Sequence, residues 1–313
     1  MGGAGGELAG DRRAARELTV HRLAAALLAV PLAVSGCAGS GSGDEHSSSS
    51  TPRAERALPA LHTTKAAGHR VSYRCMGDPS DPSVLLLAGF NTELEHAWDG
   101  VEPSIGRFAR VCAYDRLGVG NSDPPPARQT FGDLADQLDA VVTALHLHRP
   151  VVLVAHSLGG TVAVTWAEQH RDDLAGLVLL DATPSTYLQT VMTKFPRRGS
   201  TAGAELRSSL ATLLVPHANA EHLAGRQGLL TGTFGDLGSA PVTALTHTVS
   251  EWGDVTAKQG ALLDSTWLTG QQAWADLSSN GRVVSVPDAG HEIQVDQPAA
   301  VVDTVRQVVS STG

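Results

Sequence analysis

Ser157 is the residue of this sequence whose surroundings best suit covalent chemistry. It follows Val151–Ala155, an apolar run typical of a buried strand in a parallel sheet, and it precedes Thr161–His170, which is predicted to be helical. A strand-to-helix turn of this kind is sharp and needs small neighbours, and Ala155 and Gly159 stand two residues to either side. A serine on such a turn can act as a nucleophile when a base takes its proton, and otherwise it can cap the following helix.

The sequence AHSLG at residues 155–159 resembles the nucleophile elbow of the α/β-hydrolase family, Gly-x-Ser-x-Gly, with alanine in place of the first glycine. The resemblance implies a triad in the chain order serine, acid, histidine. Its histidine would be His291, which follows the last predicted strand and precedes a final helix that begins at Pro298. His156 is next to the nucleophile in sequence and is expected to point away from its hydroxyl, in a structural or pocket-lining role.

The resemblance also implies an acid and an oxyanion hole. The family most often takes its acid from the loop after the seventh strand, where this chain offers only the more distant Glu251 and Asp254. Some relatives take it from the end of the sixth strand, where this chain has Asp181. We favour Asp181, although an aspartate there is also common as a structural residue. The oxyanion donors would be the backbone N–H groups of Leu158 and Phe90.

The fold implied by the resemblance is an eight-stranded, mostly parallel sheet with helices on both faces. A small helical cap would be inserted after the sixth strand, at about residues 183–240. The string DRLGVGNS at residues 115–122 also recurs in the family, where its role is chiefly structural. Runs of apolar and β-branched residues predict strands at 61–67, 69–76, 84–88, 110–115, 151–155, 177–181, 241–247 and 282–286. Helices are predicted at 92–109, with an interruption at Pro103, and at 131–145, 161–170, 262–277 and 298–309.

The three cysteines divide into one near the N-terminus and two in the predicted sheet. Residues 1–36 combine a basic region with an apolar run at 23–34 of signal-sequence length, and the small residues before Cys37 resemble the lipobox of bacterial lipoproteins. This resemblance implies a lipid on Cys37. The alternatives are a plain secretory signal and an uncleaved anchor. Both the Sec and the Tat export routes stay open. The family's sheet order places Cys75 and Cys112 on neighbouring strands, which implies a disulfide rather than two free thiols.

Composition limits the partners of the chain. Residues 37–56 are rich in Gly and Ser and are predicted to be a flexible tether. The hydrolase domain is then predicted at residues 57–313. A lipid on Cys37 would place it in the cell envelope, anchored to the outer face of the cytoplasmic membrane. The formal net charge of −9 without a basic stripe argues against a nucleic-acid partner. No Cys-x-x-Cys pair, His-Glu-x-x-His or Walker loop occurs, so we predict no metal, nucleotide or redox cofactor. The oligomeric state stays open.

The function implied is that of a serine hydrolase, most simply an esterase acting on small-molecule esters through an acyl-enzyme. In this mechanism His291 takes the proton of Ser157, and the acid holds the imidazole. A serine at the elbow excludes the haloalkane-dehalogenase and epoxide-hydrolase reactions, which need a carboxylate nucleophile. The alternatives are a cofactor-free perhydrolase, a C–C hydrolase, a proline iminopeptidase or a non-catalytic binding lipoprotein.

Overall fold

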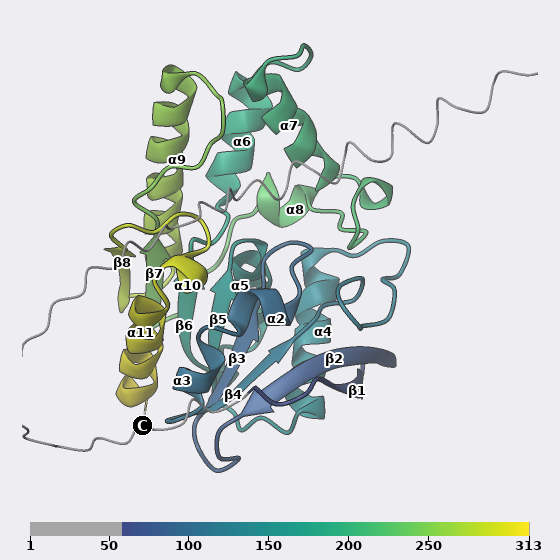
Figure 1. Ribbon diagram of the computed structural model, residues 1–313, viewed down its shortest axis with the longest axis vertical. Helices are drawn as coiled ribbons and strands as arrows, with labels where there is room; N and C mark the ends of the chain where they lie inside the picture. The colour runs from purple at the N-terminus through teal and green to yellow at the C-terminus, as the bar shows by residue number, and fades with distance from the viewer. Residues whose placement is uncertain (1–57, 313) are drawn as a thin grey trace, which may run out of the picture. The chain divides into compact units, whose positions relative to one another are not determined.

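The computed structural model describes residues 58–312, so the predicted signal, Cys37 and the tether lie outside the described residues. The described chain forms an eight-stranded sheet in the order β1-β2-β4-β3-β5-β6-β7-β8 (Figure 1). The strands are β1 (His62–Ala66), β2 (His69–Met76), β3 (Ser83–Leu87), β4 (Arg110–Tyr114), β5 (Val151–His156), β6 (Leu174–Leu180), β7 (Val242–Thr246) and β8 (Gly281–Ser285). No helix in this part of the chain is both long enough and apolar enough to cross a membrane. The predicted α/β fold with an eight-stranded sheet is confirmed.

The sheet is parallel except at β2, which runs antiparallel to both of its neighbours, β1 and β4. The chain passes from β3 to β4 on one side and then returns to β5 on the other side of β3. Strand order therefore reverses at β3. Open α/β sheets bind their ligands in the crevice at the carboxyl ends of the strands beside such a reversal, so this edge is the expected place for a site.

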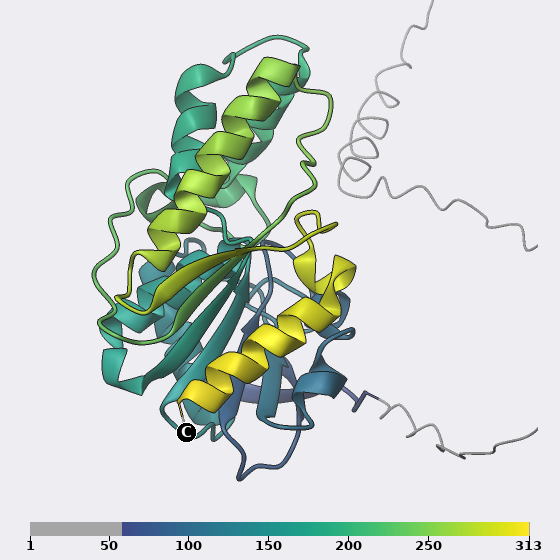
Figure 2. The same cartoon turned by 90° about the vertical axis from the view of Figure 1, so that its left-hand side faces the viewer.

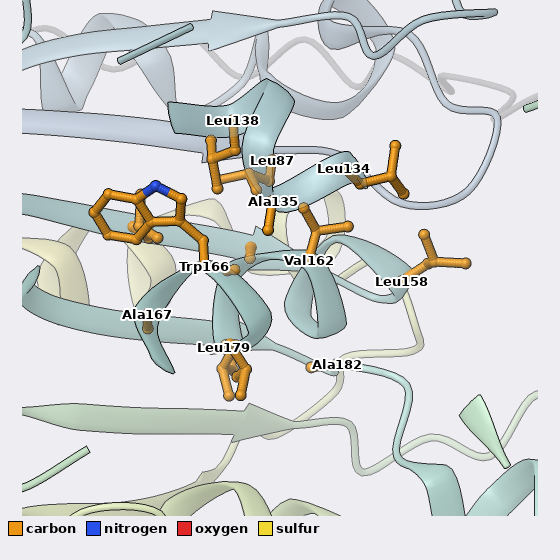
Figure 3. Packing of buried hydrophobic residues seen from close by; sticks show 14 of the residues in the cluster. Leu87, Leu134, Ala135, Leu138, Leu158, Val162, Trp166, Ala167, Leu179 and Ala182 are labelled. Carbon is orange, nitrogen blue, oxygen red and sulfur yellow. The ribbon is translucent and has the colours of Figure 1, made fainter. Parts of the chain in front are cut away.

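One face of the sheet is covered by α4 (Phe131–Ala144), α5 (Leu158–Gln169) and α9 (Ala257–Ala275). A capping box begins α4, where the hydroxyl of Thr130 and the carboxylate of Asp133 each accept from the other residue's backbone N–H. Figure 3 shows Leu138 of α4 and Trp166 of α5 in the layer that also contains Leu87 of β3. Because β3, β5, β6 and β7 lie between two helical layers, their residues are mostly apolar and almost all buried.

The opposite face is covered by α2 (Leu94–Trp98), α3 (Glu102–Ile105), α10 (Ile293–Asp296) and α11 (Pro298–Ser311), and Figure 2 shows α11 crossing it. The helix predicted over residues 92–109, with an interruption at Pro103, is two short helices in the structure. Pro103 has no N–H and is tolerated only in the first turn of a helix, so α3 starts next to it instead of continuing α2. Val301, Val305 and Val308 of α11 recur on one side and are buried against the sheet.

Residues 183–240, which we call the cap segment, contain α6 (Ser185–Lys194), α7 (Ala202–Thr212) and α8 (Arg226–Leu229). Short 3₁₀ helices occupy Arg171–Asp173, before β6, and Pro216–Ala218, within the cap segment. Figure 1 shows α6, α7 and α8 beyond the carboxyl ends of the parallel strands, with the N-terminal part of α9 beside α6. Helix α9 begins earlier than predicted because Thr256 and Gln259 form a capping box. Its Gly270 packs so closely on Pro184 that a Cβ would lie 2.2 Å from the Pro184 Cβ.

The disulfide predicted between Cys75 and Cys112 is present in the structure. The two residues are directly opposite each other on the antiparallel strands β2 and β4. Their Cα atoms are 4.1 Å apart, closer than the roughly 5.5 Å typical of disulfides. Directly opposed residues at non-hydrogen-bonded positions of an antiparallel pair approach most closely, which accounts for the short separation. The bond ties the antiparallel edge of the sheet to its parallel part.

Candidate active site

Ser157 lies on a strained turn between β5 and α5. Its backbone has φ +52° and ψ −123°, in a region that non-glycine residues rarely adopt. The turn is pressed between the ends of two other strands. A Cβ on Gly159 would lie 2.6 Å from the carbonyl oxygen of Ala88, and one on Gly160 would lie 2.4 Å from the Cβ of Ala182. Glycine is therefore required at both positions, which explains the small residues after the serine.

The side chain of Ser157 does not cap α5, although the residue stands at the N-cap position. Its Oγ lies instead 3.0 Å from Nε2 of His291. The other ring nitrogen of His291, Nδ1, lies 2.7 Å from Oδ2 of Asp181. The structure thus brings together the three residues predicted as a triad, from the ends of β5 and β6 and from the loop after β8. A hydroxyl, an imidazole and a carboxylate in this chain of hydrogen bonds can generate an alkoxide nucleophile.

Asp181 is fully buried and surrounded by donors. Its Oδ2 accepts from Nδ1 of both His247 and His291, at 2.8 and 2.7 Å, and its Oδ1 accepts from Nε1 of Trp267 at 2.7 Å. Burial alone would raise the pKa of Asp181, but the hydrogen bonds from the two histidines outweigh it and hold the pKa well below its usual range. The carboxylate is therefore charged at neutral pH and can stabilise an imidazolium.

The charge of Asp181 determines the basicity of His291. Burial lowers the pKa of the His291 imidazole, but the hydrogen bond and the negative charge of Asp181 raise it by more, so the net shift is upward. Above that pKa the neutral ring donates from Nδ1 to Asp181 and presents the lone pair of Nε2 to Ser157. This tautomer is the one that a general base needs.

The two other acids considered from the sequence do not reach the ring of His291. The carboxylate of Glu251 accepts from the backbone N–H of His291, with Oε2 at 3.1 Å, and so holds the histidine loop rather than the imidazole. Asp254 is exposed. Of the three candidates, Asp181 alone is hydrogen-bonded to the imidazole.

The loop predicted to supply an oxyanion donor lies against the serine turn. Strands β3 and β5 are neighbours, and a Cβ on Gly89 would lie 3.3 Å from the Cβ of Ser157. Among the hydrogen bonds of residues 58–312, none uses the N–H of Phe90 or of Leu158. Both groups therefore have an unused donor near the serine, as an oxyanion hole requires.

Three residues near the triad were not predicted. Thr183 lies with its Oγ1 3.1 Å from Oγ of Ser157. His247, directly after β7, shares Asp181 with His291; a histidine at the end of the seventh strand was the signal available for it. Trp267 lies in the helix predicted at 262–277, and the sequence contains no signal that its indole N–H reaches Asp181.

His156 has the structural role expected for it. Its ring is 1% exposed, and Nε2 lies 3.0 Å from the backbone carbonyl oxygen of His291. Burial, followed by the proximity of His291, lowers the pKa of His156 to about 4. The ring is therefore neutral at pH 7, and a neutral imidazole can donate from Nε2 to that carbonyl and hold the histidine loop.

Aromatic side chains line one side of the triad. Tyr187 of α6 packs against Trp252 and Trp267, with ring centroids 5.5 and 5.0 Å apart, and Trp267 lies 5.7 Å from the ring of His291. Such a cluster provides an apolar surface beside the reacting groups. Within residues 58–312, no three His, Cys, Asp or Glu side chains are grouped so that they could hold a metal ion.

Comparison with known proteins identifies the family. The family model described as "alpha/beta hydrolase fold" matches residues 82–246, more than half of the chain. The chain belongs to the α/β-hydrolase fold family. The matched range includes Ser157 and Asp181 of this α/β-hydrolase, whereas His291 lies beyond it.

Curated relatives of this α/β-hydrolase resemble it over part of its length. A haloalkane dehalogenase from Sphingobium indicum is 32% identical over 121 residues, which are 37% of this chain and 39% of the relative. An uncharacterized protein from Mycobacterium tuberculosis is 33% identical over 131 residues, 42% of this chain and 37% of the relative. The matched part spans about two fifths of the length of these relatives.

Solved structures share the fold over most of the chain. A thermophilic esterase from Thermogutta terrifontis has a TM-score of 0.56 and 22% identity, covering 82% of this chain and 99% of its own. A haloalkane dehalogenase loop variant from Bradyrhizobium elkanii has a TM-score of 0.59 and 17% identity, covering 81% and 97%. At these identities the likeness concerns the fold alone.

Proposed function

We propose that this α/β-hydrolase is a serine hydrolase that cleaves small carboxylic esters through an acyl-enzyme. The observation that carries the proposal is the chain of hydrogen bonds from Ser157 through His291 to the buried Asp181. The strained backbone of Ser157 also supports the proposal. Strain of this kind costs about 1–3 kcal/mol and is concentrated at functional sites.

The reaction follows from this geometry. As Ser157 Oγ attacks the ester carbonyl carbon, His291 Nε2 takes the hydroxyl proton and the carbonyl electrons move to the oxygen, which accepts from the N–H groups of Phe90 and Leu158. When the oxyanion collapses, the C–O bond to the alcohol breaks and His291 returns the proton to the leaving alkoxide. A water molecule, deprotonated by the same nitrogen, then releases the carboxylic acid and restores Ser157. Asp181 stabilises the imidazolium in each step.

The similarity to haloalkane dehalogenases does not extend to the dehalogenation reaction. Displacement of a halide by a carboxylate gives an alkyl ester that water can hydrolyse. A serine alkoxide would give an ether, which this machinery cannot open. The serine at residue 157 therefore favours acyl transfer, and the esterases that share the fold are consistent with it.

The cap segment is proposed to roof the site and to select the substrate. Its Tyr187 belongs to the aromatic cluster beside His291, which suits an apolar acyl or alcohol group. Export and a lipid anchor on Cys37 remain part of the proposal, supported by the sequence of residues 1–37 alone. Metabolic labelling with a fatty acid that is unaffected by Cys37→Ser would contradict the anchor.

A fluorophosphonate probe tests the hydrolase activity directly. The wild-type protein should be labelled and should hydrolyse p-nitrophenyl esters, while Ser157→Ala should do neither. Thr183→Val, which removes the neighbouring hydroxyl but leaves the triad complete, is the matched control and should still be labelled. An unlabelled wild type, or equal labelling of Ser157→Ala, would overturn the proposal.

A further inference from the structure

Arg116 is a buried cation that fixes the loop after β3. Its Nη1 donates to the carbonyl oxygen of Ala88 at 2.6 Å, and its Nη2 donates to that of Gly89 at 2.7 Å. The carbonyl of Gly89 and the N–H of Phe90 belong to one planar peptide group, so a bond that holds the carbonyl also sets the direction of the N–H. By holding the Gly89 carbonyl, Arg116 therefore orients the Phe90 N–H, the proposed oxyanion donor, on the opposite side of the same peptide group.

Glu221 of the cap segment completes this arrangement. Its carboxylate is fully buried and pairs with Arg116 through both oxygens, each at 2.8 Å. The same Oε1 accepts from the backbone N–H of Asn91 at 2.6 Å. Asn91 has φ +51°, so this peptide is held in a conformation that is uncommon for non-glycine residues. The peptides on both sides of Phe90 are thus held by one buried ion pair.

The chain around Glu221 is in turn docked on the core. Gln129 donates from Nε2 to the carbonyl oxygen of Glu221 at 2.7 Å and from its backbone N–H to that of His222 at 2.9 Å. Its own carbonyl oxygen accepts from the N–H of Ala224 at 2.7 Å. This strand-like pairing with Gln129 positions the carboxylate of Glu221 against Arg116, although the two residues are 105 positions apart in sequence.

We propose that Glu221 is a positioning residue for the oxyanion hole. Through Arg116 and Asn91, the docked cap segment sets the orientation of the Phe90 N–H. The cap segment then determines the rate of the chemical step as well as the choice of substrate. This inference rests on the proposed ester hydrolysis, but its structural part concerns the loop alone and can be measured without turnover.

Glu221→Gln is the informative variant, because glutamine keeps an acceptor for Asn91 but cannot neutralise Arg116. Loss of one oxyanion donor lowers kcat by about 10²–10³-fold, so a misaligned donor should lower it by about 10- to 100-fold. KM should change by less than about threefold, since the donor acts on the oxyanion rather than on the bound ester. Hydrogen exchange of the amides in residues 88–92 should also be faster than in the wild type.

The matched control is Glu102→Gln. Glu102 is likewise fully buried and pairs with a buried arginine, Arg74, but this ion pair lies between α3 and β2 and does not contact the loop after β3. The comparison is made at pH 8, because burial raises the pKa of Glu102 to about 7. Both variants then lose a buried carboxylate and should lower the midpoint of thermal unfolding, Glu221→Gln by more, because Arg74 keeps Asp99 as a second partner. Only Glu221→Gln should lower kcat and speed exchange in residues 88–92.

The outcomes separate the two proposals. Unchanged kcat in a folded Glu221→Gln protein, or an equal loss of kcat in Glu102→Gln, would overturn the positioning role. A wild type without turnover or labelling would refute ester hydrolysis instead. In that case the exchange experiment still decides whether Glu221 orders the loop, and unchanged exchange would overturn that as well. If Glu221→Gln fails to fold, Arg116→Lys is the second variant, because lysine keeps the charge but loses the forked contacts to Ala88 and Gly89. It should likewise lower kcat and speed hydrogen exchange in residues 88–92. An unaltered kcat in Arg116→Lys would count against the inference.

Discussion

Replacing Asp181 by asparagine is the sharpest test of the triad. The carboxylate accepts from both histidines through Oδ2 and from Trp267 through Oδ1. If the amide oxygen of asparagine faces Trp267, its NH₂ group faces two imidazole nitrogens that were donors. If the amide is reversed, its NH₂ group faces the indole N–H. One of the contacts must then pair two donors unless the histidines change tautomer.

The tautomer change determines the size of the effect. With the amide NH₂ facing it, Nδ1 of His291 becomes an acceptor and the ring proton moves to Nε2. That nitrogen then donates to Ser157 and cannot take its proton. The equivalent change in a serine-protease triad lowers kcat by about 10⁴-fold, which corresponds to about 5 kcal/mol in the barrier. We expect a loss of this order in kcat for a p-nitrophenyl ester, with a folded protein.

The pH profile provides a second readout. In the wild type, kcat/KM should fall as the pH falls through the pKa of His291, which lies above its ordinary value because of Asp181. Any residual activity of Asp181→Asn should show this fall at a lower pH, since the charge that raised the pKa is gone.

Glu251→Gln is the control for the Asp181 variant, because Glu251 contacts only the backbone of His291. It should lose less than about tenfold in kcat. The reasoning is refuted if Asp181→Asn keeps more than about a tenth of the wild-type activity, or if Glu251→Gln loses as much as Asp181→Asn does.

Two further predictions concern stability. Replacing both Cys75 and Cys112 by serine removes a disulfide that closes a loop with a sequence separation of 37. The unfolded chain then gains conformational entropy, and the free energy of unfolding should fall by about 4 kcal/mol in urea titrations. An unchanged urea midpoint would contradict this. The pKa of the buried His156 is about 4, against 6.5 for an ordinary histidine, so between these values the unfolded chain binds a proton that the folded protein does not. The free energy of unfolding should therefore fall by up to about 3 kcal/mol as the pH falls from 6.5 towards 4. His156→Gln should flatten this slope, and an equal slope in both proteins would show that another group causes it.

Several elements could be predicted because their signals are local. The serine turn follows from an apolar strand and a helix with small residues between them, and the structure adds the reason, since Gly159 and Gly160 are pressed against the ends of β3 and β6. The start of α4 follows from Thr130 and Asp133, which form hydrogen bonds with each other. The disulfide could be predicted only because the resemblance to a family supplied the sheet order that pairs Cys75 with Cys112.

The sequence, with the family resemblance it carries, predicted the class of fold, the candidate nucleophile Ser157 and the candidate base His291, because strand, turn and helix are encoded in neighbouring residues and the family's triad follows a fixed chain order. It left the acid open between Asp181, Glu251 and Asp254, because that choice depends on which strand end lies beside the imidazole in space. It also gave no sign that Glu221 joins the loop of Phe90, which precedes it by 131 positions in sequence. Buried charges find partners through packing between distant segments, and only the tertiary structure shows which segments meet.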